Sequence, residues 1–196
     1  MFTGIIEALG TIKKVTRDKA NIHFDIESDV SAHLKIDQSV AHDGTCLTVV
    51  EQVDNTHRVT AIRETLLKTN LGSWKEGARV NLERCMPANG RFDGHIVQGH
   101  VDTVGKCVEK LDDEGSWRFR FTHPEAREFT TVPKGSITIN GVSLTVVDSE
   151  PGSFSVAIIP YTYQHTGFKV IEVGAAVNLE FDIVGKYVAR LMNLKG

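Results

Sequence analysis

An eight-residue phrase occurs twice in this chain. It reads DGTCLTVV at residues 43–50 and NGVSLTVV at residues 140–147. When residues 39–83 are laid over residues 136–180 without a gap, 16 of the 45 positions are identical. Average residue usage would give about three identities by chance. The 196-residue chain therefore contains an internal duplication, and its two halves are expected to fold alike.

Within each half, the apolar residues follow the period of β-strands. Apolar and polar side chains alternate at residues 22–26 and 117–121, and short runs rich in Val, Ile and Thr are broken by turn residues. This pattern predicts an all-β chain with a small antiparallel barrel in each half. The expected strands are 5–15, 22–27, 39–42, 45–53, 58–61 and 79–84, and then 101–110, 117–122, 136–139, 143–149, 153–159 and 176–182. Brief helical turns are expected at 29–34, 64–69, 124–129 and 161–166.

The end of the chain carries a different pattern. Val184, Tyr187, Val188, Leu191 and Met192 are spaced as one face of an amphipathic helix. The first half of the chain has no counterpart of this apolar stripe. Such a helix either folds back on its own barrel or packs against copies of itself, and the pattern leaves both open. The predicted domains are a barrel at 1–96, a barrel at 97–182 and a helix at 183–196.

Composition argues against several kinds of partner. The net charge is −3 without a basic run, which disfavours nucleic acid. No apolar stretch approaches the roughly 20 residues of a membrane span, and the first residues do not resemble a signal peptide. The three cysteines, Cys46, Cys85 and Cys107, lack metal-ligand spacing, so we expect no metal site and free thiols in a reducing cytoplasm.

Further motifs resemble those of one enzyme family. The start MFTGII, the doubled phrase, the run GHIVQGHVD at residues 94–102 and the phrase TNLG at residues 69–72 are together similar to riboflavin synthases of the alpha-chain type. The resemblance spans the whole chain. It implies two six-stranded Greek-key barrels that each bind a lumazine, followed by a helix through which a homotrimer assembles. It also implies that no metal or organic cofactor is used, and it leaves open an association with lumazine synthase.

The reaction implied by this resemblance joins two copies of one substrate. Two molecules of 6,7-dimethyl-8-ribityllumazine are dismutated by four-carbon transfer to riboflavin and 5-amino-6-ribitylamino-2,4-pyrimidinedione. In the family, the active site pairs the N-terminal barrel of one subunit with the C-terminal barrel of its neighbour. A duplicated fold suits this chemistry, because holding two reactants in register can lower a barrier by ~7–11 kcal/mol. The resemblance does not say which barrel holds the donor.

Donor and acceptor sites must differ, and the repeat differs at a few positions. Cys46 stands opposite Ser143, and Ile5 stands opposite His100. We expect His100 to transfer a proton in the second barrel. The resemblance and these differences give a catalytic set of His100, Ser143, Cys46, Thr145, Asp182 and Phe2. The implied substrate-binding set is Gly4, Ile5, Ile6, Cys46, Leu47, Thr48, Thr60, Ala61, Ile62, Arg63, Glu64, Thr65, Gly99, His100, Val101, Lys134, Ser143, Leu144, Thr145, Ile159, Pro160, Tyr161, Thr162, Tyr163 and Gln164.

Two other functions compete with the enzyme. The first is a non-catalytic lumazine- or flavin-binding protein of the same duplicated fold. The presence of His100, Cys46, Ser143 and Thr145 together favours the enzyme. The second is the flavin-binding barrel of a reductase, which needs a nicotinamide-binding α/β domain. The sequence contains no GxGxxG motif after a predicted strand, and this disfavours the reductase.

Overall fold

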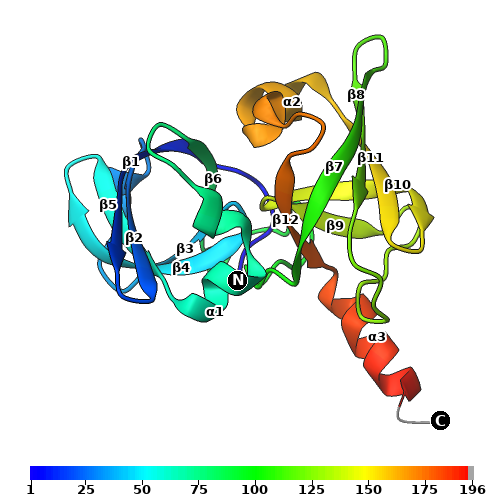
Figure 1. Cartoon of the computed structure of the whole chain (residues 1–196), viewed down its shortest axis with the longest axis horizontal. Helices are drawn as coiled ribbons and strands as arrows, with labels where there is room; N and C mark the ends of the chain where they lie inside the picture. Colours follow the sequence, from blue (N-terminus) through cyan, green and yellow to red (C-terminus); the bar gives the residue numbers. More distant parts are fainter. Residues whose placement is uncertain (194–196) are drawn as a thin grey trace.

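The two halves of the chain form two closed six-stranded antiparallel barrels that lie side by side (Figure 1). The computed structural model describes residues 1–193. The first barrel consists of β1 (Ala8–Asp18), β2 (Asn21–Glu27), β3 (Ser39–His42), β4 (Thr45–Val53), β5 (Thr56–Ala61) and β6 (Arg79–Arg84). The second consists of β7 (Thr103–Asp112), β8 (Trp117–Thr122), β9 (Ser136–Ile139), β10 (Val142–Glu150), β11 (Ser153–Ile158) and β12 (Ala176–Phe181).

Strand order is the same in both barrels. It runs β1-β2-β5-β4-β3-β6 in the first and β7-β8-β11-β10-β9-β12 in the second, which is the predicted Greek-key arrangement. The register also shifts at matching places, between Val49 and Glu51 in β4 and between Val146 and Ser149 in β10. The predicted fold class is therefore confirmed.

Short helices connect the strands. They are α1 (Arg63–Lys68) and α2 (Pro160–His165), with 3₁₀ turns at Ser31–His33, Asn70–Ser73 and Gly167–Val170. The prediction of a helical turn at residues 124–129 is wrong. That segment holds a single turn closed by Phe129 N–H donating to the Ala126 carbonyl at 3.0 Å. The Phe129 ring stacks on Phe181 with a centroid distance of 5.1 Å, so its packing favours the loop.

The doubled phrase places two tight turns back to back. Asp43 and Asn140 have φ of 44° and 45°, and Gly44 and Gly141 have φ of 78° and 81°, as hairpin turns of this kind require. A Cβ atom on Gly44 would lie 2.7 Å from the Gly141 nitrogen, and a Cβ on Gly141 would lie 2.7 Å from the Gly44 nitrogen. The turns can therefore touch only because both residues are glycine.

Paired asparagines tie the two barrels together around these turns. The Asn81 side-chain amide donates to the Asn140 carbonyl at 2.8 Å, and the Asn178 amide donates to the Asp43 carbonyl at 2.9 Å. Asn81 and Asn178 are both buried, and they are equivalent in the repeat. The barrels are thus related by an approximate twofold axis, and buried polar groups that find partners only in this arrangement specify it.

The segment before each barrel crosses to the other barrel. We call residues 2–7 the first arm and residues 97–102 the second arm. They pair with each other through Phe2 and Val97. Gly4 in the first arm accepts a hydrogen bond from Ser143 N–H at 2.8 Å, and Gly99 in the second arm accepts one from Cys46 N–H at 2.8 Å. Because the arms leave their own barrels, β1 and β7 begin later than the sequence pattern predicted.

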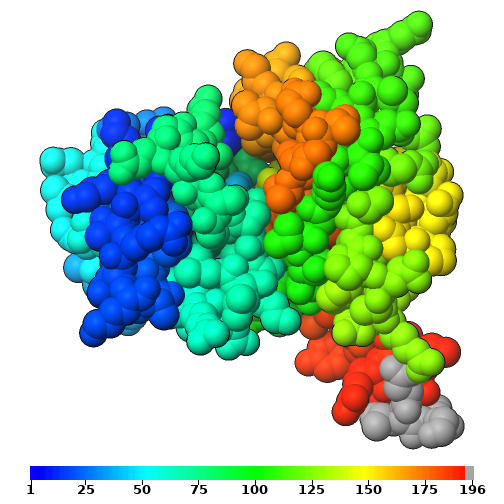
Figure 2. Space-filling model, in the orientation of Figure 1, coloured from blue at the N-terminus to red at the C-terminus, as the bar shows by residue number. Residues whose placement is uncertain are grey.

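The C-terminal helix α3 (Ile183–Asn193) extends away from the second barrel, as Figures 1 and 2 show. Its five stripe residues are between 51% and 72% exposed. The stripe therefore does not fold back on its own barrel, which removes one of the two alternatives. Within residues 1–193, no helix is long and apolar enough to cross a membrane.

Candidate functional site

Two equivalent positions on the outer surfaces of the barrels carry the predicted chemistry. On β4, Cys46 is half-buried and Thr48 is exposed, while Leu47 between them lies in the barrel core. On β10, Ser143 and Thr145 occupy the matching outward positions. This alternation follows from the period of a strand. Each barrel thus presents a nucleophilic side chain and a threonine to the surface crossed by an arm.

The first barrel's site combines Cys46 with the second arm. A Cβ on Gly99, which has φ of 77°, would lie 2.7 Å from Cys46 Cβ, so the arm backbone lies directly on the cysteine. His100 follows in the arm, and its side chain is exposed. The expected role of His100 in the second barrel remains a prediction. The arm that carries it bonds to Cys46 on β4 through the Gly99 carbonyl, and to Glu180 on β12 through the amide of His100 itself. Burial raises the pKa of the Cys46 thiol, so the neutral thiol is favoured.

In the second barrel's site, Ser143 bonds to a histidine that was not predicted. Ser143 Oγ lies 2.7 Å from His95 Nδ1, and Thr138 Oγ1 lies 3.4 Å from His95 Nε2. Burial lowers the pKa of His95, while the carboxylate of Asp182 acts in the opposite direction. The imidazole is therefore neutral near pH 7 and can accept the Ser143 hydroxyl proton at Nδ1. Asp182 also accepts a hydrogen bond from Val184 N–H at 2.9 Å at the start of α3.

His95 lies within the run GHIVQGHVD, but no pattern in the sequence indicated its role. Its spacing from His100 puts the two on opposite sides of an extended segment, so the sequence argued against a shared site. The structure agrees that they are separate, since His95 faces Ser143 and the arm with His100 lies on Cys46. His, Cys, Asp and Glu side chains of residues 1–193 form no group of three that could hold a metal ion.

A cavity of about 550 Å³ opens beside Ser143. Its volume lies within the range of small-molecule sites. The predicted residues that line it are Gly4, Ile5, Ile6, Ser143, Tyr161, Thr162 and Gln164. The first arm and α2 therefore meet over the second barrel. Another cavity, of about 540 Å³ beside residues 125–131 and 149–152, contains none of the predicted residues.

Some predicted residues turn their side chains away from these surfaces. Leu47 and Ala61 belong to the first barrel's core, and Leu144 packs against the core of the second. Tyr163 is stacked on Trp117 with ring centroids 3.8 Å apart. From their present positions, these residues could meet an outer-surface ligand chiefly through their main chain.

Phe2 is fully buried and packs with Ala41, Val97 and Cys46. A ring in this position cannot reach a ligand on the outer surface. It can support the cysteine and the second arm from beneath, since its Cε2 atom lies 2.8 Å from the Cβ position of Gly99. The structure thus places Phe2 as a support for the first site.

The remaining predicted positions lie at loop ends or on the outer surface. Ile62, Arg63, Glu64 and Thr65 lie at the β5–α1 junction, Ile159 and Pro160 at the β11–α2 junction, Val101 in the second arm, and Lys134 before β9. Lys134 N–H donates to the Val146 carbonyl at 2.9 Å. These junctions occupy equivalent places in the two barrels.

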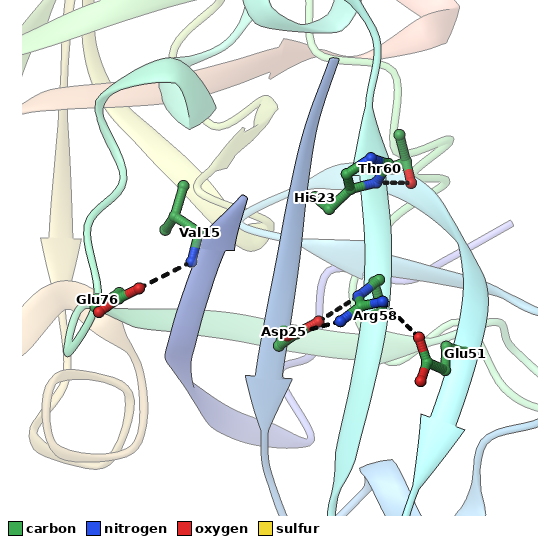
Figure 3. A network of polar contacts seen from close by, with 7 residues as sticks. All are labelled: Val15, His23, Asp25, Glu51, Arg58, Thr60 and Glu76. Atoms are coloured by element: carbon green, nitrogen blue, oxygen red, sulfur yellow. Dashed lines mark hydrogen bonds and ion pairs between the residues drawn. The ribbon is translucent and has the colours of Figure 1, made fainter. Parts of the chain in front are cut away.

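Thr60 belongs to a polar network on the first barrel's outer surface (Figure 3). Its hydroxyl lies 2.9 Å from His23 Nδ1. In the same network, Arg58 donates to Asp25 at 2.5 and 3.0 Å and to Glu51 at 2.6 Å. The outer surface of β2, β4 and β5 is therefore ordered by cross-strand polar contacts, which hold Thr60 at the predicted site.

Comparison with known proteins agrees with this geometry. Residues 3–85 and 98–182 each match the family model described as lumazine binding domain. A riboflavin synthase from Actinobacillus pleuropneumoniae is 42% identical over 194 residues, covering 98% of this chain and 90% of the relative. One from Mycobacterium tuberculosis (strain ATCC 25618 / H37Rv) is 40% identical over 202 residues, covering 100% of both chains.

Solved structures share the architecture. LumP complexed with riboflavin superimposes with a TM-score of 0.86 at 22% identity, covering 93% of this chain and 100% of that chain. LumP complexed with 6,7-dimethyl-8-(1'-D-ribityl) lumazine gives a TM-score of 0.83 at 21% identity, covering 92% and 98%. At these identities the likeness concerns the fold alone. From the duplicated family model and the full-length relatives, the chain belongs to the riboflavin synthase family.

Proposed function

We propose that this chain converts two molecules of 6,7-dimethyl-8-ribityllumazine into riboflavin and 5-amino-6-ribitylamino-2,4-pyrimidinedione. The reaction is a transfer of a four-carbon unit between two identical substrates, so the enzyme is a transferase. The observation that carries the proposal is the pair of related but unlike sites. One joins Cys46 to the arm with His100, and the other joins Ser143 to His95.

The unlike sites suit a reaction in which identical molecules take opposite roles. Each barrel provides the same scaffold, so two lumazines are held in related poses. The side chains around them differ, so one can lose a proton from its 7-methyl group while the other accepts a nucleophile. In this proposal His100 and His95 are the groups that move protons, because each lies in or beside a site.

Ser143 and His95 form a nucleophile–base pair in this scheme. The Ser143 hydroxyl donates to His95 Nδ1, and the proton passes to the imidazole as the serine oxygen, or a water bound to it, adds to an electron-poor ring carbon. The Asp182 carboxylate, which raises the pKa of His95, stabilises the imidazolium that forms. Thr145, which is exposed two residues along β10, would donate a hydrogen bond to the ring.

The decisive experiment uses purified protein and the lumazine as the sole substrate. Riboflavin and the pyrimidinedione should appear in equal amounts, measured by separation and absorbance. Stable bound lumazine fluorescence without riboflavin would instead support the alternative, a non-catalytic lumazine- or flavin-binding protein. The variant His100→Ala should fold normally and lose most turnover, and full turnover would remove His100 from the mechanism.

We also propose that α3 assembles three copies of the chain, so that the first barrel of one subunit meets the second barrel of the next. The exposed stripe of α3 supports this, because monomers seldom leave such surfaces in water. Truncation after Asp182 should give a monomer with little activity, and an unchanged trimer in sedimentation would contradict the assignment. We propose in addition that the chain has three domains, at residues 1–96, 97–182 and 183–196, and that the protein is cytoplasmic.

Association with lumazine synthase is a further expectation of the family resemblance. Co-sedimentation of the two purified proteins tests it. Independent sedimentation would remove that partner while leaving the catalytic proposal intact.

A further inference from the structure

A buried glutamate holds each arm against the barrels. Glu83, which is 5% exposed, accepts hydrogen bonds from the backbone amides of Thr3 at 2.6 Å and Gly4 at 2.9 Å. Its repeat equivalent Glu180, which is 3% exposed, accepts them from Gln98 at 2.7 Å and from His100 at 2.9 Å. The position of His100 therefore depends directly on the Glu180 carboxylate.

A second acid ends each arm, and here the two halves differ. In the first arm, Glu7 accepts a hydrogen bond from Arg84 N–H at 2.9 Å and pairs with the Arg84 guanidinium at 2.7 Å. These side chains are 32% and 45% exposed. The first arm is thus held by a cation on β6, within its own barrel.

In the second arm, Asp102 accepts a hydrogen bond from Phe181 N–H at 2.8 Å. Phe181 is the repeat equivalent of Arg84 and carries no charge. The missing cation comes from α3, where Lys186 Nζ lies 2.8 and 2.6 Å from the two Asp102 oxygens. Both side chains are only 19% exposed, so this pair is better shielded from water than its counterpart in the first arm.

We propose that Lys186 is a positioning residue for His100, and that through Asp102 it lets helix α3 set the geometry of the first barrel's site. The helix acts on that site through the arm. It fixes the end of the second arm, and the arm carries Gly99 onto Cys46 and His100 beside it. The inference rests on the proposed function, since His100 must act on a lumazine bound there.

The charge of Lys186 also bears on Glu180. Burial raises the pKa of Glu180, the amides of Gln98 and His100 and the charge of Lys186 lower it, and Asp102 raises it. Cys46 is a further titratable group that faces Glu180. Because the charge of Lys186 lowers the pKa of Glu180, removing that charge should raise this pKa. A protonated Glu180 has one acceptor oxygen fewer for the two arm amides.

The test compares Lys186→Met with Arg190→Met, which removes the same charge from an exposed position one turn later in α3. Lys186→Met should lower kcat by about 10–100-fold, the scale expected when a reacting group is displaced. In the pH profile of kcat/KM for this variant, the acid limb should move to higher pH, because the pKa of Glu180 is raised. Lys186→Arg should restore most activity, and Arg190→Met should resemble the native chain. Adding Asp102→Asn to Lys186→Met should cost little more, because the two residues act as one unit.

Hydrogen exchange gives a readout that does not depend on catalysis. In Lys186→Met, the amides of residues 98–102 should exchange faster, while those of the first arm should be unchanged. Native kcat and unchanged exchange in the second arm would overturn the inference, and so would equal loosening of both arms. If the native protein formed no riboflavin, the proposed function would fail, yet the exchange measurement would still decide whether Lys186 holds the arm.

Discussion

The buried histidine pair in the first barrel predicts a specific pH dependence of stability. His42 and His57 are 0% and 1% exposed, and their Nε2 atoms lie 2.8 Å apart. His42 Nδ1 donates to the Val40 carbonyl at 3.0 Å, so its Nε2 must accept from His57. His57 Nδ1 then accepts from the Ser31 hydroxyl at 2.7 Å. This hydrogen-bond pattern satisfies all four ring nitrogens with both rings neutral, and burial disfavours a charge on either ring.

The magnitude follows from the pKa values. Burial lowers the pKa of His57 to about 4 from its ordinary value of 6.5, and burial together with repulsion by His57 lowers the pKa of His42 well below that value. Because the folded pKa is depressed, the unfolded chain binds more protons between pH 6.5 and 4. The histidine pair therefore leaves the free energy of unfolding undiminished above pH ~6.5, and it lowers this free energy as the pH falls below that value. At pH 5, His57 alone should favour unfolding by about 2 kcal/mol, and His42 should add to this.

The repeat supplies the variant that tests this account. Its equivalents of His42 and His57 are Ile139 and Phe154, both buried in the second core. The double variant His42→Ile/His57→Phe should gain about 2 kcal/mol or more relative to the parent when the pH is lowered from about 7.5 to 5. Stability is measured by urea unfolding.

A single tryptophan can report on the first barrel. The chain has two tryptophans, so a Trp117→Phe background leaves only Trp74, which packs on Phe24. Asp43 does not confuse the comparison. Burial raises its pKa to about 7, which favours folding as the pH falls, but this effect is common to parent and variant. The reasoning is refuted if the stability difference between them is the same at both pH values.

Three further predictions concern the sites and the barrel interface. Ser143→Ala should lower kcat by about 100-fold or more with little change in stability, since it removes the hydroxyl bonded to His95; steady-state kinetics and thermal melting check this. Cys46→Ser should keep much of the activity, because burial disfavours the thiolate, and loss comparable to Ser143→Ala would show that the sulfur is required. Gly44→Ala should destabilise the chain by more than about 2 kcal/mol, because the new methyl would lie 2.7 Å from a backbone nitrogen. Gly77→Ala is its control, with φ of 85° and no atom within 4 Å, and equal losses in both variants would show that backbone strain alone is responsible.

Local patterns in the sequence determined most of the architecture. Strand alternation, the Asp-Gly and Asn-Gly turns and the duplication predict two like barrels, because each depends on residues close together in the chain. The same alternation put Cys46 and Ser143 on outer surfaces. The stripe from Val184 to Met192 likewise predicted the helix and its apolar surface.

Only the tertiary structure decided which residues meet. The crossing of the second arm lays Gly99, the neighbour of His100, on Cys46 of the other barrel, and His95 bonds with Ser143. The second barrel itself brings Asp102 to Lys186, 84 positions later in the chain, because Asp102 N–H donates to the Leu179 carbonyl of β12 just before α3. The contacts of the crossing arms depend on the packing of the two barrels around the touching glycine turns. No periodicity within a single strand or helix encodes that packing, so the partners of the catalytic side chains appear only when the barrels are placed together.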